Sequence, residues 1–122
     1  MATKSTFEDK IIAELKEANR KFKYEPIKIK YVIEANYIPD LVLGNGIIVE
    51  LKGYFRVDAM TKMIAVKKAN PTLDIRFVFM SSKSAVQGAK VRKNGTKMTC
   101  GEFAEKHGFP YAEKHIPTEW FN

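Results

Sequence analysis

A short hairpin in the first half of the chain places the strongest constraint on the fold. Two runs rich in apolar residues flank Gly44-Asn45-Gly46, and the second run extends from Ile47 to Lys52. An Asn-Gly turn between two such runs predicts a pair of antiparallel strands. Because side chains alternate between the faces of a strand, Glu50 and Lys52 point the same way, and the hairpin returns them beside Asp40. The sequence therefore predicts two carboxylates and one ammonium group in a small volume.

These residue types are suited to metal-dependent cleavage of phosphodiesters. Asp40 and Glu50 offer hard oxygen ligands for one or two Mg²⁺ ions, which stabilise charge on a phosphate and lower the pKa of a bound water. Lys52 would orient that water or neutralise charge on the phosphate, and the backbone carbonyl of Leu51 is a further candidate metal ligand. A surface hairpin with a solvated Glu–Lys pair has the same spacing, so the pattern alone leaves both interpretations open.

The charge of the chain favours a polyanionic partner. Its formal net charge is +7 and its pI is near 9.5, and neutralising phosphates with such an excess of cations releases condensed counterions. Five cations without nearby acids lie in a turn-rich segment, 81–97, and three more follow the site on a predicted helix. Solvated surfaces account for these residues as well. The candidate DNA-contacting side chains are Lys62, Lys67, Lys68, Lys83, Lys90, Arg92, Lys93 and Lys97.

Length and cysteine content narrow the class of protein further. The 122 residues fit one domain, and the lone Cys100 excludes an intramolecular disulfide and a cysteine-held zinc ion. No apolar stretch approaches the ~20 residues of a membrane span, and no signal-peptide core follows Met1. We therefore expect a soluble, cytoplasmic protein with no membrane partner.

Hydrophobic periodicity predicts an α/β fold with a mixed sheet flanked by helices. A strand, a helix and a second strand in succession predict a parallel pair. Before the hairpin we expect a helix from Phe7 to Phe22, opened by a capping box at Ser5–Glu8, and a half-buried strand from Tyr24 to Ile33. After the hairpin we expect a helix capped by Asp58 and ended by Asn70, and a strand from Leu73 to Met80 that is buried on both faces. A loop over 81–97 then leads to a helix from the Thr99–Glu102 capping box through His107, and the tail docks Trp120 on the core.

Several blocks of the chain, in order, resemble the endonuclease I family of T-seven-like phages, which are four-way-junction resolvases of the PD-(D/E)xK superfamily. The resemblance implies a restriction-endonuclease-like core and a DNA endonuclease that resolves Holliday and other branched junctions. It further implies Mg²⁺ as cofactor, with Mn²⁺ as a candidate substitute, and no small-molecule cofactor. The blocks are Tyr37–Gly53, Leu73–Phe79, Ser81–Lys83, Gly101–Gly108 and Ile116–Trp120.

The resemblance also assigns roles to individual residues. Asp40 and Glu50 match the metal-binding carboxylates of the family, and Lys52 matches its catalytic lysine. Glu8 matches an additional acidic residue on the first helix, which implies a metal or water role. Taken alone, Glu8 is the capping-box acceptor for Ser5, and the two roles are compatible.

The family forms an intertwined, domain-swapped homodimer. The resemblance therefore implies one nuclease domain over 1–122, in which the helix and strand of 1–32 are swapped, 33–37 form the bridge, and 38–122 form the catalytic core. Glu8 would then act with Asp40, Glu50 and Lys52 of the partner. The bridge here is shorter than the family pattern and lacks its proline. The sequence also lacks the lysine-rich extension of family members after Trp120, so we expect DNA affinity to depend more on the basic loop, residues 81–97.

Two other functions are compatible with the same residues. One is a free-standing, sequence-specific endonuclease of homing or restriction type built on this core. The other is a non-catalytic basic DNA-binding module, although clustered acids facing phosphate would weaken a pure binder. Cleavage and binding assays distinguish these alternatives.

Overall fold

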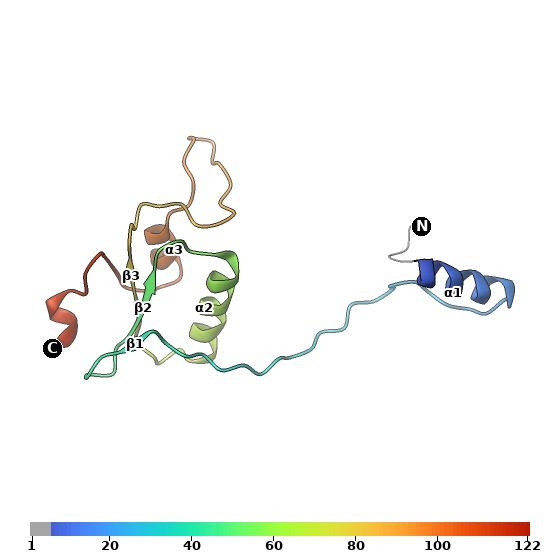
Figure 1. Ribbon diagram of the computed structural model, residues 1–122, viewed down its shortest axis with the longest axis horizontal. Helices are drawn as coiled ribbons and strands as arrows, with labels where there is room; N and C mark the ends of the chain where they lie inside the picture. The colour runs from blue at the N-terminus through green and yellow to red at the C-terminus, as the bar shows by residue number, and fades with distance from the viewer. Residues whose placement is uncertain (1–5) are drawn as a thin grey trace. The chain divides into compact units, whose positions relative to one another are not determined.

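The computed structural model describes residues 6–122, and the chain divides into two compact units, 1–35 and 36–122. The capping box expected at Ser5–Glu8 begins outside the described residues. The N-terminal unit contains helix α1, Thr6–Glu17 (Figure 1). The larger unit contains the sheet and the remaining helices. No helix within residues 6–122 is long and apolar enough to cross a membrane.

Helix α1 ends five residues before the expected position at Phe22 because Asn19 takes a left-handed conformation, with a φ of 60°. The backbone N–H groups of Asn19 and Arg20 donate to carbonyls in the last turn, at 3.1 and 2.9 Å. This Schellman arrangement satisfies the final carbonyls and turns the chain away. The helical spacing that continued to Phe22 was therefore misleading, and Asn19 was the stop signal.

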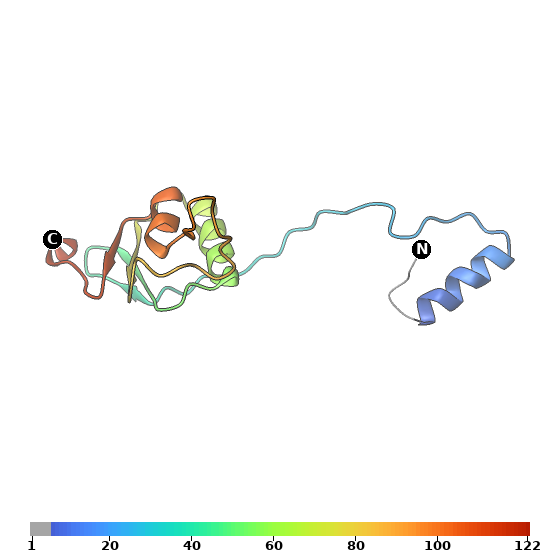
Figure 2. The same ribbon diagram turned by 90° about the horizontal axis from the view of Figure 1, so that it is seen from above.

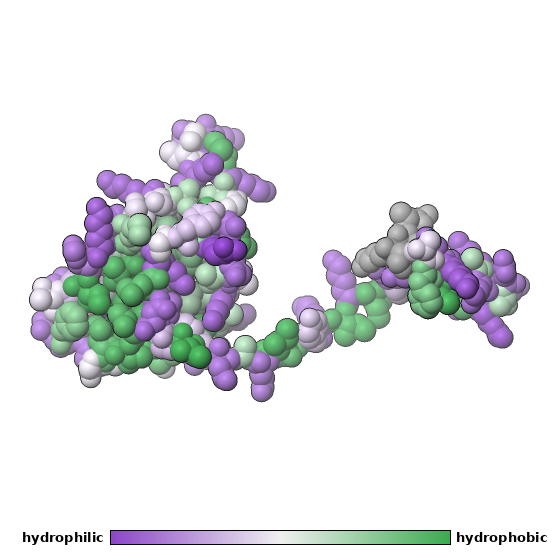
Figure 3. Space-filling view, in the orientation of Figure 1, coloured by the Kyte–Doolittle hydropathy of each residue, from purple (hydrophilic) through white to green (hydrophobic). Residues whose placement is uncertain are grey.

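The strand expected from Tyr24 to Ile33 was wrong for the single chain, since the structure assigns no strand there. Alternating apolar residues are not sufficient, because a strand also needs a neighbouring strand to pair with its backbone. The side chains of Ile27, Ile29 and Ile33 are 72%, 78% and 72% exposed. Figure 3 shows exposed apolar side chains along this segment.

The larger unit is built on a four-stranded mixed sheet in the order β1-β2-β3-β4. Strand β1 is antiparallel to β2, whereas β2, β3 and β4 are parallel, which confirms the mixed α/β class and the expected parallel step. Strand β4 was not expected from the sequence. The strands are β1 (Leu41–Val42), β2 (Ile48–Lys52), β3 (Ile75–Phe79) and β4 (Tyr111–Glu113).

The helices of this unit cover the two faces of the sheet unequally. Helices α2 (Val57–Ala69) and α3 (Cys100–Lys106) pack on one face, and the short 3₁₀ helix η1 (Thr118–Phe121) packs on the other. Figure 1 and Figure 2 both show the sheet between these two layers. Trp120 of η1 is 7% exposed and contacts the second face, as expected for a docked tail.

An aromatic cluster forms the core between the sheet and its two helices. Phe77 is fully buried, and its ring lies 5.4 Å from that of Phe55, 5.4 Å from that of Phe79 and 4.9 Å from that of Phe109. Such tilted and offset ring pairs add to the stabilisation from burial. Along β2, alternation sends Ile48 to this core and the next residue to the face covered by η1.

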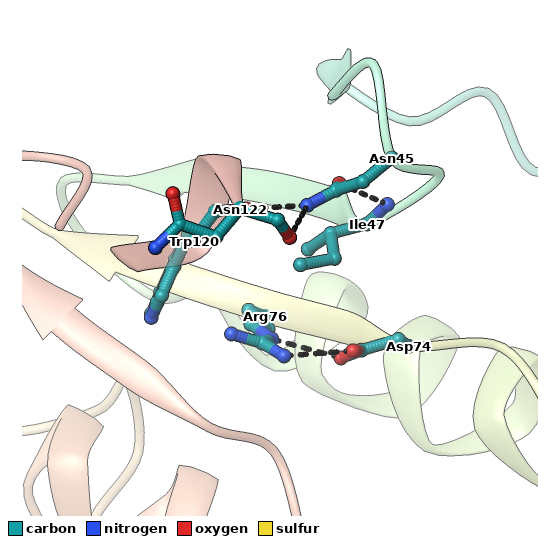
Figure 4. Close-up of polar contacts among 6 residues, drawn as sticks. All are labelled: Asn45, Ile47, Asp74, Arg76, Trp120 and Asn122. Carbon is teal, nitrogen blue, oxygen red and sulfur yellow. Dashed lines mark hydrogen bonds and ion pairs between the residues drawn. The ribbon is translucent and has the colours of Figure 1, made fainter. Parts of the chain in front are cut away.

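The hairpin turn forms as expected and is held by the tail of the chain. Gly46 has a φ of 91°, which favours glycine at this position. The Asn45 side chain donates to the Trp120 and Asn122 carbonyls at 2.7 and 3.1 Å and accepts from the Ile47 N–H at 3.2 Å (Figure 4). The turn and η1 therefore restrain each other.

A bidentate ion pair lies beside this contact. The Arg76 guanidinium donates to both carboxylate oxygens of Asp74, at 2.9 and 2.8 Å (Figure 4). These hydrogen bonds are the main reason that the pKa of Asp74 is lowered. The same guanidinium lies 5.2 Å from the centre of the Trp120 ring, so β3 also contributes to the docking of η1.

The helix boundaries follow their capping chemistry. Helix α3 begins with the expected reciprocal capping box between Thr99 and Glu102. Helix α2 ends at Asn70 as expected, but its N-cap is Arg56 and not Asp58. Asp58 instead lies in the first turn, where its negative charge is favourable next to the helix dipole.

We expect Phe77→Ala to lower the free energy of unfolding by about 3–5 kcal/mol, because it leaves a cavity at the centre of the aromatic cluster. Urea unfolding followed by circular dichroism measures this change. Val91→Ala is the control, since Val91 is 64% exposed and its loss should change stability by less than about 0.5 kcal/mol. Equal effects of the two substitutions would contradict the assignment of the core.

Candidate active site

The hairpin brings Asp40, Glu50 and Lys52 together. Asp40 immediately precedes β1, and the other two residues lie on β2 with side chains on the face that carries α2. The Asp40 N–H donates to Glu50 Oε1 at 3.1 Å, and Lys52 Nζ lies 3.6 Å from Glu50 Oε2. The structure thus gathers two carboxylates and an ammonium group around the end of β2.

Glu50 is the most buried charged group of this cluster, with 3% of its surface exposed. A buried carboxylate is unfavourable unless hydrogen bonds and charges compensate its lost hydration. Lys52 supplies a positive charge, and the Tyr37 hydroxyl donates a hydrogen bond to Glu50 Oε1. The pKa of Tyr37 is strongly raised, first by burial of its hydroxyl and then by this bond and the charge of Glu50.

The backbone carbonyl of Leu51 faces the same cluster. The Leu51 N–H donates to Asp40 Oδ2 at 2.8 Å, and the N–H and C=O of one strand residue point to the same side. Continuing the register Leu41↔Val49 by two residues on each strand places Pro39 opposite Leu51. Because proline has no N–H, it cannot pair with this carbonyl, which stays oriented towards the carboxylates.

The donor groups suit Mg²⁺, which commonly takes one or two protein carboxylates and keeps several waters. Asp40 and Glu50 supply two carboxylates, and the Leu51 carbonyl supplies a third oxygen from the same end of β2. Within residues 6–122, no three Asp, Glu, His or Cys side chains form a metal-binding group, so the cluster has a small ligand set.

Glu8 belongs to the N-terminal unit and lies in the first turn of α1. Its Oε2 accepts a hydrogen bond from the Tyr24 hydroxyl at 2.5 Å. Within either unit taken by itself, Glu8 is therefore not brought to Asp40 and Glu50. A role for Glu8 at the site depends on an assembly of the two units.

The three candidate lysines of α2 lie in different surroundings. Lys62 Nζ lies 5.7 Å from the centre of the Tyr37 ring, and Lys67 Nζ lies 4.9 Å from that of Phe109. Both positions favour a cation over an aromatic face. Lys68 is exposed. Lys62 is therefore the lysine of α2 that connects to the cluster, through Tyr37.

The basic loop is less free of acids than its sequence suggested. Arg92 Nη1 lies 2.8 Å from Glu102 Oε2, and this bond is the main reason that the pKa of Glu102 is lowered. The expectation that these cations lack nearby acids was therefore wrong for Arg92, because Glu102 of α3 folds next to the loop. The other candidate cations of the loop, which are also exposed, are Lys83, Lys90, Lys93 and Lys97.

Two residues near the cluster were not among the expected site residues. Tyr37 contacts Glu50, and its position three residues before Asp40 was the only signal in the sequence. Lys114 follows β4 and lines an open hollow of about 360 Å³ together with Lys52. Because β2, β3 and β4 are parallel, their carboxyl ends meet at one edge. The part that β4 and Lys114 take in this edge was not visible in the sequence, since β4 was not expected.

Adjacent carboxylates, a backbone carbonyl and a lysine are the groups with which metal-dependent nucleases act on phosphodiesters. Comparisons with known proteins agree with this class. Residues 1–122 match the family described as phage endonuclease I.

The chain is 42% identical to Endonuclease I of Escherichia phage T7, over 98% of this chain and 78% of that protein. It is 40% identical to Endodeoxyribonuclease 1 of Enterobacteria phage T3, over 95% and 74%. The chain belongs to the phage endonuclease I family.

The raised pKa of Tyr37 predicts how stability depends on alkaline pH. The unfolded hydroxyl ionises near its ordinary pKa of 10.0, whereas the folded hydroxyl stays protonated to higher pH. Its contribution to the free energy of unfolding is therefore complete below about pH 10 and is lost as the pH rises further. Urea unfolding of wild type and Tyr37→Phe, from about pH 8 to about pH 11, should show a difference that shrinks above about pH 10. The other tyrosines cancel in this difference, and a constant difference would contradict the assignment.

Proposed function

We propose that this protein is a Mg²⁺-dependent DNA endonuclease that resolves four-way and other branched DNA junctions. The observation that carries the proposal is the convergence of Asp40, Glu50 and Lys52 at the end of β2 in a chain of the phage endonuclease I family. The relatives are named endonuclease and endodeoxyribonuclease, and both are phage proteins. The proposal therefore places the enzyme in the cytoplasm of an infected cell.

The residues of the site divide the chemical work between binding and charge neutralisation. Asp40, Glu50 and the Leu51 carbonyl would hold Mg²⁺, which when bound supplies positive charge to the scissile phosphate. Lys52 keeps its ammonium group beside this position, with 22% of the side chain exposed, and donates hydrogen bonds to a phosphate oxygen or to the attacking water. The protein interior that buries Glu50 excludes water on this side of the cluster, and its lower dielectric strengthens these interactions.

The net charge of +7 supports a substrate bound through its phosphates. Contacts to the DNA backbone position a protein without reading the sequence, so a shape-selective enzyme needs distributed cations more than base contacts. Lys68 on α2 and the exposed lysines of the loop provide such cations. Arg92 is less available because Glu102 pairs with it.

We further propose that the enzyme is a domain-swapped homodimer. The segment 24–33 keeps the period of a strand, yet Ile27, Ile29 and Ile33 remain exposed in the single chain. Pairing with a second copy would bury these side chains and satisfy their backbone groups. In such a dimer Glu8 of one chain would act with Asp40 and Glu50 of the other. Two sites related by a two-fold axis also suit a branched DNA that is cut in two opposed strands.

Cleavage of an immobile four-way junction beside the matching linear duplex tests the activity. We expect the wild type to nick the junction preferentially with Mg²⁺ and not with EDTA. Glu50→Gln and Lys52→Met should each lower the rate by roughly 100-fold or more, because the first removes a negative charge that would hold Mg²⁺ and the second removes a positive charge aimed at the reacting phosphate. Glu119→Gln removes an exposed acid of η1 and should leave the rate unchanged.

Other results of the same assay would redirect the proposal. Equal cutting of junction and duplex, or cutting restricted to one sequence, would favour a homing or restriction type of enzyme. Tight binding without cleavage in any divalent metal would favour a DNA-binding module.

Mixed dimers test whether each site combines two chains. Glu8→Gln and Glu50→Gln chains, each inactive as a homodimer, are co-expressed with different affinity tags and purified as the heterodimer. In a swapped dimer one site carries both substitutions and the other carries neither, so we expect one strand of the junction to be nicked at a rate within about 10-fold of wild type.

If each chain instead completes its own site, both sites of the heterodimer carry one substitution, and no activity should return. Wild-type chains carrying the same two tags serve as the control for any effect of the tags. Analytical ultracentrifugation of the same samples shows whether the chains are dimers at the assay concentration.

A further inference from the structure

Both acceptor positions of one Glu50 oxygen are already used by the protein. Glu50 Oε1 accepts the Tyr37 hydroxyl and the Asp40 backbone N–H, the latter at 3.1 Å. A carboxylate oxygen offers about two lone-pair positions, so these two donors occupy Oε1. The other oxygen, Oε2, lies 3.6 Å from Lys52 Nζ, the ammonium group that would contact the phosphate.

We propose that Tyr37 is a positioning residue that makes Glu50 bind a divalent cation through Oε2 alone. This inference rests on the proposed function, because it assumes that Asp40 and Glu50 hold the metal. With its hydroxyl on Oε1, Tyr37 prevents the carboxylate from turning both oxygens to one ion. The Asp40 N–H contributes to the same restraint from the backbone, where side-chain substitution does not remove it.

Tyr37 is well placed to act as a fixed restraint. Its ring packs against the buried core cluster, and the ammonium group of Lys62 on α2 lies 5.7 Å from the ring centre. A tyrosine has few rotatable bonds, so ordering it costs little conformational entropy. Tyr37 also lies at the start of the larger unit, which begins at Asn36, and therefore attaches the incoming chain to the active-site carboxylate.

The one-oxygen restraint has a consequence for metal choice. Mg²⁺ requires near-octahedral geometry at short distances, and a carboxylate that binds through one oxygen fits this geometry. Ca²⁺ is larger, takes six to eight oxygens and readily accepts both oxygens of a carboxylate. Tyr37 should therefore favour Mg²⁺ over Ca²⁺ at this site. Loss of a residue with only a structural role should change the Mg²⁺ and Ca²⁺ affinities by the same factor.

Isothermal titration of the full-length protein with MgCl₂ and with CaCl₂, in the absence of DNA, tests the proposal. For Tyr37→Phe, which keeps the ring and removes only the hydroxyl, we expect Mg²⁺ affinity to fall by about 10-fold. Ca²⁺ affinity should fall less, since the acceptor position of Oε1 that the Tyr37 hydroxyl leaves becomes available to it. The concentration of Mg²⁺ needed for half-maximal junction cleavage should rise in parallel.

The chain provides a matched control and an internal check. Tyr111→Phe also removes a hydroxyl that donates to a glutamate, here Glu105 at 2.9 Å, but at an exposed pair outside the site. It should leave both affinities unchanged. In a Glu50→Gln background, adding Tyr37→Phe should lower Mg²⁺ affinity no further, because Tyr37 acts through Glu50.

The possible failures are distinguishable. Unchanged affinities in Tyr37→Phe, or equal proportional losses for Mg²⁺ and Ca²⁺, would overturn the one-oxygen role and leave the proposed function intact. An additive loss in the Glu50→Gln background would overturn the route through Glu50. A wild type that binds neither cation and cleaves without metal would overturn the proposed function, and this inference with it.

Discussion

The buried carboxylate of Glu50 is the group on which the arrangement of the site depends. At 3% exposure it has lost nearly all contact with water, so its hydrogen bonds and its ion pair compensate the lost hydration of the carboxylate. Its partners come from three places: Tyr37 at the start of the unit, the Asp40 backbone before β1, and Lys52 at the end of β2. The entry segment and the hairpin are thereby fixed around one side chain.

The sheet explains why this cluster lies at an accessible edge and not within the core. The parallel strands end together at one edge of the sheet, beside the loops. Many open α/β sheets bind their ligands at this edge, outside the carboxyl ends of the strands. Strand β1 pairs with β2 over only two residues, because Pro39 lacks an N–H and Asp40 takes the next backbone donor of β2 with its side chain. The early end of the ladder leaves the Leu51 carbonyl without a strand partner beside the Asp40 carboxylate. Asp40 is exposed, so a substrate has access to this side of the cluster, whereas Glu50 lies buried behind it.

Local signals in the sequence were reliable where a short-range rule was sufficient. The Asn45-Gly46 turn formed the hairpin, and the box from Thr99 to Glu102 opened α3, since both depend on neighbours in the chain. The strand expected over 24–33 failed because a strand requires a backbone partner that periodicity does not supply. A local signal, Asn19, also marked the early end of α1. The prediction missed it because the helical spacing of apolar residues continues to Phe22.

By itself, the sequence determined the class of fold, the hairpin and the identity of the clustered acids and lysine, because alternation and turn chemistry act over a few residues. Only the tertiary structure decided which donors surround Glu50, since the Tyr37 hydroxyl approaches from 13 residues away. It also decided that Arg92 pairs with Glu102 and that Lys114 lines the same hollow as Lys52. These contacts depend on how separate elements pack, and no local pattern encodes the distance between two elements.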